Sequence, residues 1–104
     1  MGYNNQRYSA LKAINKGNVA NLAPTWNYSL NNSQSAESQP FIHDGVMYVT
    51  SHTHTMAVNA LTGRQIWKQE VELPADFAKY TCCGLLNRGV AILNGKLYRG
   101  TLDA

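Results

Sequence analysis

Two adjacent cysteines, an arginine and a glutamate are the side chains of this sequence best suited to chemistry: Cys82, Cys83, Arg88 and Glu37. Adjacent cysteines in an arbitrary protein behave as buried small hydrophobic residues or as a pair of free thiols. A zinc site is disfavoured, because two cysteines without a spacer do not readily ligate one ion. By default, Arg88 is a solvated charge at a strand end and Glu37 an exposed carboxylate. Whether these four side chains form one site depends on the strands and loops that position them.

Three histidines, His43, His52 and His54, raise the question of a metal site. His52-Thr53-His54 places two imidazoles on one face of a strand. The segment is turn-like, however, and we expect these histidines to be exposed to solvent. The sequence predicts no metal ligand in this chain.

Length and composition exclude several classes of protein. The 104 residues allow one small domain or a piece of a larger one. Charged residues make up 14% of the chain, which argues against a charged disordered tail. The formal charge of +3 comes from scattered Lys and Arg residues, so nucleic-acid binding is not predicted. The longest apolar runs, residues 46–49 and 90–93, are too short to span a membrane. The first residues lack a signal peptide, so the protein is either cytosolic or has its export signal outside this chain.

Short strands dominate the pattern. Residues 15–22 contain possible asparagine caps and precede Pro24, which predicts one short N-terminal helix. A long connection over residues 71–87 contains Pro74 and the cysteine pair, with one helical turn around residues 75–79. The predicted strands, separated by Gly-containing turns or polar loops, are residues 25–29, 40–43, 46–50, 55–59, 64–69, 88–93 and 96–101.

The strand pattern repeats. Asn94-Gly95-Lys96-Leu97-Tyr98 echoes Asp44-Gly45-Val46-Met47-Tyr48 fifty positions earlier. A period of about 40–50 residues with about four strands indicates antiparallel β-propeller blades. The second copy stops within the repeat, and since one blade cannot bury its apolar faces alone, we expect a fragment of a larger propeller. The other interpretation is a complete small protein whose C-terminus pairs elsewhere.

This period divides the chain into four parts. We expect a lead-in segment with a first strand at residues 1–35 and a blade at residues 36–70. A loop at residues 71–87 follows, and the truncated start of the next blade occupies residues 88–104.

Two motifs carry a resemblance to a known family. The string Ala57-x-Asn59-x-x-Thr62-Gly63-x-x-x-Trp67 resembles the tryptophan-docking motif of quinoprotein alcohol dehydrogenases, although members usually have Asp at the position of Asn59. These pyrroloquinoline quinone (PQQ) enzymes are eight-bladed propellers. Residues 81–89 resemble the family's Cys-Cys-x-x-x-Asn-Arg-Gly segment. The resemblance extends over nearly the whole chain and matches the N-terminal part of the mature enzyme.

The resemblance implies an activity and a set of cofactor contacts. It implies PQQ-dependent oxidation of a primary or secondary alcohol to an aldehyde or ketone, in the periplasm, with cytochrome c as electron acceptor. It implies that Cys82 and Cys83 form a vicinal disulfide lying over the cofactor face, that Arg88 reaches the quinone oxygens, and that Glu37 contacts the cofactor edge. An arginine suits this role, because its guanidinium stays charged and donates directed hydrogen bonds. Asn87 and Gly89 are expected to shape the turn that presents Arg88.

The resemblance also implies parts that this chain does not contain. Family members use a calcium or lanthanide ion as a Lewis acid and an Asp as base. No position here matches those residues, so we assign no catalytic residue and expect the isolated chain to be inactive. The alternative function is a non-catalytic propeller of PQQ-like repeats that serves as a binding or scaffold module. Residues 81–89 favour the enzyme, because a scaffold has no use for a cysteine pair followed by Asn-Arg-Gly.

We predict that Cys82 and Cys83 are oxidised in material from an oxidising compartment, since a disulfide persists there. Alkylation under denaturing conditions followed by peptide mass spectrometry should leave both sulfurs unmodified, and prior reduction should make both reactive. Two alkylated thiols without reduction would remove the main support for the cofactor site.

Overall fold

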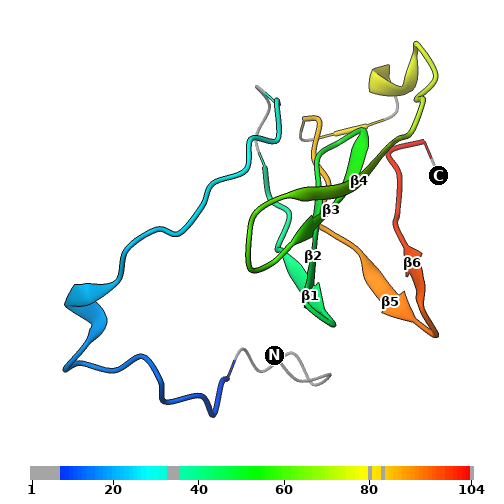
Figure 1. Cartoon of the computed structure of the whole chain (residues 1–104). Coiled ribbons are helices and arrows are strands. Elements are labelled where there is room, and N and C mark those ends of the chain that lie inside the picture. Colours follow the sequence, from blue (N-terminus) through cyan, green and yellow to red (C-terminus); the bar gives the residue numbers. More distant parts are fainter. Residues whose placement is uncertain (1–7, 33–35, 80, 83, 104) are drawn as a thin grey trace.

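In the residues that the structure describes, the fold consists of two antiparallel sheets and two 3-10 turns (Figure 1). The computed structural model describes residues 8–32, 36–79, 81–82 and 84–103. The first sheet has the order β1-β2-β3-β4 and the second is a two-stranded hairpin, which confirms the predicted all-β class with antiparallel pairing. The elements are η1 (Val19–Asn21), β1 (Phe41–His43), β2 (Val46–Thr50), β3 (His54–Asn59), β4 (Gln65–Glu70), η2 (Phe77–Lys79), β5 (Ala91–Leu93) and β6 (Lys96–Tyr98).

The sequence repeat corresponds to two hairpins of the same design. Phe41 pairs with Tyr48 across β1 and β2, and Ala91 pairs with Tyr98 across β5 and β6, again fifty positions apart. In each hairpin both turn residues have positive φ: Asp44 (48°) and Gly45 (76°) in the first, and Asn94 (50°) and Gly95 (72°) in the second. A two-residue turn with positive φ at both positions matches the right-handed twist of the two strands. Asx-Gly is the preferred pair there, because both residues tolerate positive φ. The repeat therefore fixes both the turn and the register.

The core lies along β3, one of the two central strands. Met56, Ala57 and Val58 are its buried hydrophobic residues. The edge strands β1 and β4 are exposed along their whole length, and Trp67 of β4 packs against Tyr48 with ring centroids 6.1 Å apart. A single small sheet buries few apolar side chains, because no second layer of helices or strands packs against its faces.

The turn between β3 and β4 explains the first motif. The Asn59 side-chain oxygen accepts hydrogen bonds from the amides of Leu61 and Thr62, at 3.0 and 2.9 Å. An Asp oxygen could accept the same two bonds, so Asn59 preserves the function of the residue that the family usually has there. Gly63 has a φ of +72° and an added Cβ would lie 2.7 Å from the Trp26 ring. The glycine thus serves both the turn and the packing of Trp26.

The N-terminal arm follows an extended path away from the sheets before Trp26 brings it back (Figure 1). The Trp26 indole N–H donates to the carbonyl of Ala60 at 3.2 Å, and the Tyr28 hydroxyl hydrogen-bonds to the Gln65 side chain. The strand predicted over residues 25–29 is wrong: these residues form no strand pairing in the described structure. The alternating large side chains that suggested a strand instead anchor a non-strand segment to the first sheet.

The predicted N-terminal helix is reduced to the single 3-10 turn η1. The Asn18 side chain accepts from the Asn15 amide and donates to the Ala13 carbonyl, so it binds the residues before the turn. It makes no capping bond to the helix itself, and the helix ends at Leu22 in extended backbone. The helical turn predicted around residues 75–79 is present as η2.

Arg99 connects the second hairpin to the first sheet. Its guanidinium donates to the Thr55 hydroxyl at 3.0 Å, to the Ser51 carbonyl at 2.9 Å and to the His52 carbonyl. Arg99 bonds to the first sheet in this way and does not pair with β5. Strand β6 ends at Tyr98 rather than at residue 101 as predicted. Similarly, β5 begins at Ala91 rather than at residue 88, because residues 87–89 form a hydrogen-bonded turn.

Within the described residues, no helix is long and apolar enough to cross a bilayer.

We predict that Gly63→Ala destabilises the protein more than Gly45→Ala. Both glycines have positive φ, where an alanine costs about 1–2 kcal/mol because its Cβ lies too close to the following carbonyl oxygen. Only at Gly63 does the new methyl group meet an obstacle, the Trp26 ring, which adds about 1–3 kcal/mol of overpacking. Urea unfolding of the two variants measures the difference, and equal losses would contradict the close contact between Gly63 and Trp26.

Candidate functional site

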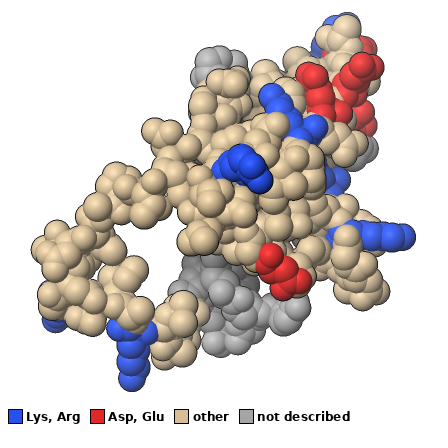
Figure 2. All heavy atoms as spheres, viewed as in Figure 1, with Lys and Arg blue, Asp and Glu red and all other residues tan. Residues whose placement is uncertain are grey.

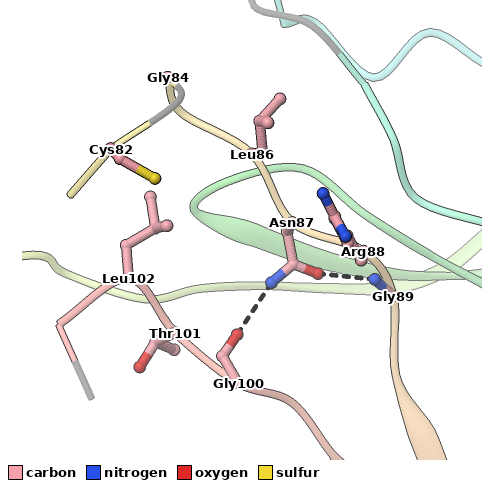
Figure 3. Close-up of a pocket in the computed structure, with 9 residues that line it drawn as sticks. All are labelled: Cys82, Gly84, Leu86, Asn87, Arg88, Gly89, Gly100, Thr101 and Leu102. Carbon is pink, nitrogen blue, oxygen red and sulfur yellow. Dashed lines mark hydrogen bonds between the residues drawn. The ribbon is translucent and has the colours of Figure 1, made fainter.

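The cysteine-containing loop and the segment after β6 line a pocket of about 420 Å³ that is open to solvent. Cys82 and Leu102 lie on one side of it, and Asn87 and Arg88 on the other (Figure 3). The lining residues are Cys82, Gly84, Leu86, Asn87, Arg88, Gly89, Gly100, Thr101 and Leu102. The structure therefore places two of the predicted site residues, Cys82 and Arg88, around one pocket.

Asn87 holds the two walls of this pocket together. Its side-chain Nδ2 donates to the Gly100 carbonyl at 2.8 Å, and its Oδ1 accepts from the Gly89 amide at 3.0 Å (Figure 3). The same oxygen accepts a second bond, at 2.6 Å, from the hydroxyl of Thr50 at the end of β2. The prediction that Asn87 shapes the turn presenting Arg88 is confirmed, and the structure adds that Asn87 also fixes this turn to the sheet.

Gly89 completes the turn. Its φ is +116°, a conformation that is strained for residues with a side chain. An added Cβ would also lie 3.4 Å from the carbonyl oxygen of Gln39, so the loop packs closely on the segment that follows Glu37.

Glu37 and Arg88 form an ion pair, although fifty-one positions separate them in the sequence. The Arg88 Nε lies 3.2 Å from Glu37 Oε2, and the side chains are 83% and 46% exposed. A guanidinium has five N–H donors, so the ion pair at Nε leaves the terminal NH₂ groups for a ligand. An exposed pair of this kind contributes little to stability but orients both side chains.

The other predicted cysteine, Cys83, lies outside the described residues, and the vicinal disulfide stays a prediction. Among the described residues, no three His, Cys, Asp or Glu side chains come together as possible metal ligands.

The expected solvent exposure of the histidines is confirmed for His43, whereas His52 and His54 are only partly exposed. The His54 side chain is only 22% exposed: its Nδ1 lies 2.9 Å from the Thr53 hydroxyl and its Nε2 lies 3.6 Å from Glu70 Oε1. His43 is half exposed beside Asp44. Strand pairing of β3 with β4 brings Glu70 opposite His54, a contact that the turn-like sequence did not indicate.

Basic side chains do not gather into one patch on the visible face of the molecule. Figure 2 shows Lys and Arg side chains spread over the visible face, whereas most of the visible acidic atoms gather over the part that carries η2.

Burial lowers the pKa of the Arg99 guanidinium from its ordinary value through desolvation. Arg99 remains charged at neutral pH, since an arginine starts from a very high pKa. Its bonds to the first sheet make it a structural cation, whereas Arg88 is exposed at the pocket.

Sequence reasoning missed two residues that support the site, Ser38 and Thr50. Both are small and polar, and nothing in their local pattern marks them. Ser38 follows Glu37 directly, and Thr50 is the last residue of a strand, so only the folded arrangement shows that they meet.

Comparison with known proteins points to one family. The sequence model of the PQQ family, described as the glucose/ethanol/alcohol dehydrogenase β-propeller domain, matches residues 2–101. The 1-butanol dehydrogenase (quinone) of Thauera butanivorans is 43% identical over 107 aligned residues, which cover 100% of this chain. The chain spans only 17% of the length of that relative.

Solved structures agree. A quinohemoprotein alcohol dehydrogenase, ADHIIG of Pseudomonas putida HK5, superposes with a TM-score of 0.89 and 42% identity, over 94% of this chain and 14% of that one. A europium-containing methanol dehydrogenase superposes with a TM-score of 0.81 and 28% identity, over 91% of this chain and 17% of that one. Both superpositions cover most of this chain, so the agreement extends beyond a single sheet.

We predict that Asn87→Asp destabilises the protein by about 1–3 kcal/mol, because an oxygen then replaces the Nδ2 donor facing the Gly100 carbonyl. Asn94→Asp is the matched control. It places in the second hairpin turn the residue that Asp44 provides in the first, so its cost should stay within about 0.5 kcal/mol. Urea unfolding measures both free energies, and equal values would show that the Asn87 amide does not join the two pocket walls.

Proposed function

Because the chain belongs to the PQQ family of glucose, ethanol and alcohol dehydrogenase β-propeller domains, we propose that it supplies one part of the PQQ site of an alcohol dehydrogenase. The whole protein would oxidise a primary or secondary alcohol to an aldehyde or ketone. The observation that carries the proposal is the Glu37–Arg88 ion pair beside the pocket that Cys82 lines. The names of the similar proteins, a butanol and a methanol dehydrogenase among them, support the reaction class.

The described residues fit a flat, anionic quinone. A planar ligand needs walls with little side-chain bulk, and an added Cβ at Gly84 or Gly100 would meet nothing within 4 Å. Its negative charge needs a cation, and Arg88 offers an exposed guanidinium whose Nε side is held by Glu37. The pocket is open, and its lining comes only from the loop before β5 and the segment after β6. The chain thus supplies part of the site, and we infer that it would be inactive by itself.

Arg88 has a defined task in this arrangement. Bound PQQ would supply the two-electron oxidation of the alcohol. The guanidinium would donate hydrogen bonds to the quinone oxygens and stabilise the negative charge that develops there. It keeps its own charge throughout, so it acts by electrostatics and takes no part in proton transfer.

Cys82 and Glu37 would complete this side of the site. In the proposal, Cys82 and Cys83 close a vicinal disulfide that lies over the cofactor face, which requires an oxidising compartment. Glu37 would contact the cofactor edge and hold Arg88 in register. Two carboxylates cannot approach closely without donors between them, so the guanidinium also screens Glu37 from an anionic ligand.

The remaining parts of the proposal concern the whole protein. It would be an eight-bladed propeller located in the periplasm, with electrons passing to a cytochrome c. A calcium or lanthanide ion would act as Lewis acid, with ligands outside this chain. One of the similar structures is a methanol dehydrogenase that contains europium, which supports a lanthanide as one option.

We predict that Arg88→Lys lowers kcat for alcohol oxidation about tenfold or more and weakens PQQ binding, with no loss of stability. A lysine keeps the charge but not the directed pair of donors, and the Arg88 side chain is 83% exposed. The full-length protein would be reconstituted with PQQ and calcium and assayed with ethanol, 1-butanol and an artificial electron acceptor.

The matched control is Arg64→Lys, an exposed arginine in the β3–β4 turn region. It should leave kcat and PQQ binding unchanged. A full-length protein that binds PQQ but tolerates Arg88→Lys would remove Arg88 from the site, and one that binds no PQQ would overturn the proposed function.

A further inference from the structure

A buried hydroxyl connects the segments that carry Glu37 and Arg88. Thr50, the last residue of β2, is 1% exposed. Its Oγ1 lies 2.9 Å from Ser38 Oγ and 2.6 Å from Asn87 Oδ1, and its amide nitrogen lies 3.2 Å from the same Ser38 oxygen. Ser38 directly follows Glu37, and Asn87 directly precedes Arg88.

The direction of each hydrogen bond follows from the chemistry of the groups. Asn87 Oδ1 can only accept, so the Thr50 hydroxyl must donate to it. Thr50 Oγ1 then has lone pairs left and accepts from the Ser38 hydroxyl, while Ser38 Oγ accepts from the Thr50 amide. The hydrogen bonds from Ser38 through Thr50 to Asn87 therefore run in one direction only, and each of the two hydroxyl groups donates its proton to the next residue in this series.

This chain of bonds restricts the ion pair from both sides. Glu37 and Arg88 are exposed and long, and an exposed pair does not fix its own geometry. In contrast, the side chain of the residue next to each of them, Ser38 and Asn87, is hydrogen-bonded to a single buried atom, Thr50 Oγ1. Thr50 does not line the pocket, so it would act on a ligand only through its two partners.

We propose that Thr50 is a positioning residue of the PQQ site: its hydroxyl sets the position of Arg88 relative to Glu37 by joining Ser38 and Asn87. The proposal rests on the proposed function, since it assigns Thr50 to the same cofactor site. It concerns the hydroxyl, not the shape of the side chain. A serine should therefore substitute for Thr50, and a valine should not.

The experiment compares Thr50→Val with Thr50→Ser in the full-length protein. Titration of the PQQ-free protein with PQQ, followed by the absorption of the bound quinone, gives the dissociation constant without turnover. We expect a dissociation constant about tenfold higher for Thr50→Val, together with a shifted quinone absorption band, and wild-type values for Thr50→Ser. If Thr50 served packing alone, the order would reverse, because Thr50→Ser removes a buried methyl group whereas Thr50→Val retains its volume.

A second measurement needs no cofactor. Asn87 Oδ1 accepts from the Gly89 amide, so deuterium uptake of a peptide covering residues 84–90 reports how firmly Asn87 is held. In the PQQ-free protein we expect faster uptake in Thr50→Val and wild-type uptake in Thr50→Ser. Ser38→Ala provides a milder test if Thr50→Val does not fold, because Ser38 is only partly buried and its loss leaves the Thr50–Asn87 bond intact. It should change PQQ affinity in the same direction as Thr50→Val.

Thr62→Val, in the exposed β3–β4 turn, is the matched control and should leave PQQ affinity and uptake at residues 84–90 unchanged. If wild-type protein binds PQQ and Thr50→Val binds it equally well, the positioning role is wrong and the proposed function stands. If wild-type protein binds no PQQ, the proposed function and the positioning role both fall, whereas the exchange data still show whether Thr50 holds Asn87.

Discussion

The side chain of Asn87 is the contact on which the pocket depends. A carboxamide offers a donor and an acceptor at fixed separation, and here each is used: the donor for Gly100, the acceptor for Gly89 and Thr50. The end of β2, the turn before β5 and the segment after β6 thereby meet at one group. Because Thr50 is buried, its bond to Asn87 is shielded from water and is stronger than an exposed equivalent. Residues 84–90, directly before β5, obtain a defined shape in this way without a helix or strand of their own.

In this site, some residues carry the charge and other residues hold them in position. The charged side chains, Glu37 and Arg88, stay in contact with water, so neither incurs the desolvation cost of a buried ion pair. The neutral groups beneath them are hydrogen-bonded around the buried Thr50, and these set the geometry. An anionic ligand would then displace water from a guanidinium that is already oriented, which reduces the ordering cost of binding.

The rest of the fold shows the same reliance on neighbouring segments. Among the described residues, the buried hydrophobic side chains are confined to β3, whereas large apolar side chains such as Leu11 (86%) and Leu61 (84%) are exposed. A propeller blade buries its faces against adjacent blades, and stability in repeat architectures comes largely from such interfaces. The relatives that this chain matches are several times longer, which agrees with a blade designed to be covered. Within the described part, Trp26 and Arg99 are side chains that attach the outer segments to the first sheet.

The sequence by itself determined the two hairpin turns and the family. Asx-Gly at positions 44–45 and 94–95 was enough to predict both hairpins, because turn geometry depends on the conformations open to those two residues. The Cys-Cys-x-x-x-Asn-Arg-Gly segment was enough to select the candidate residues around the pocket. Tertiary structure decided what sequence spacing cannot show: that Glu37 meets Arg88, that Ser38 and Thr50 lie beneath them, and that residues 25–29 attach by side chains and not as a strand. Those contacts join residues far apart in the chain, and their positions follow from how the sheet is paired and packed. Local propensity carries no information about that arrangement.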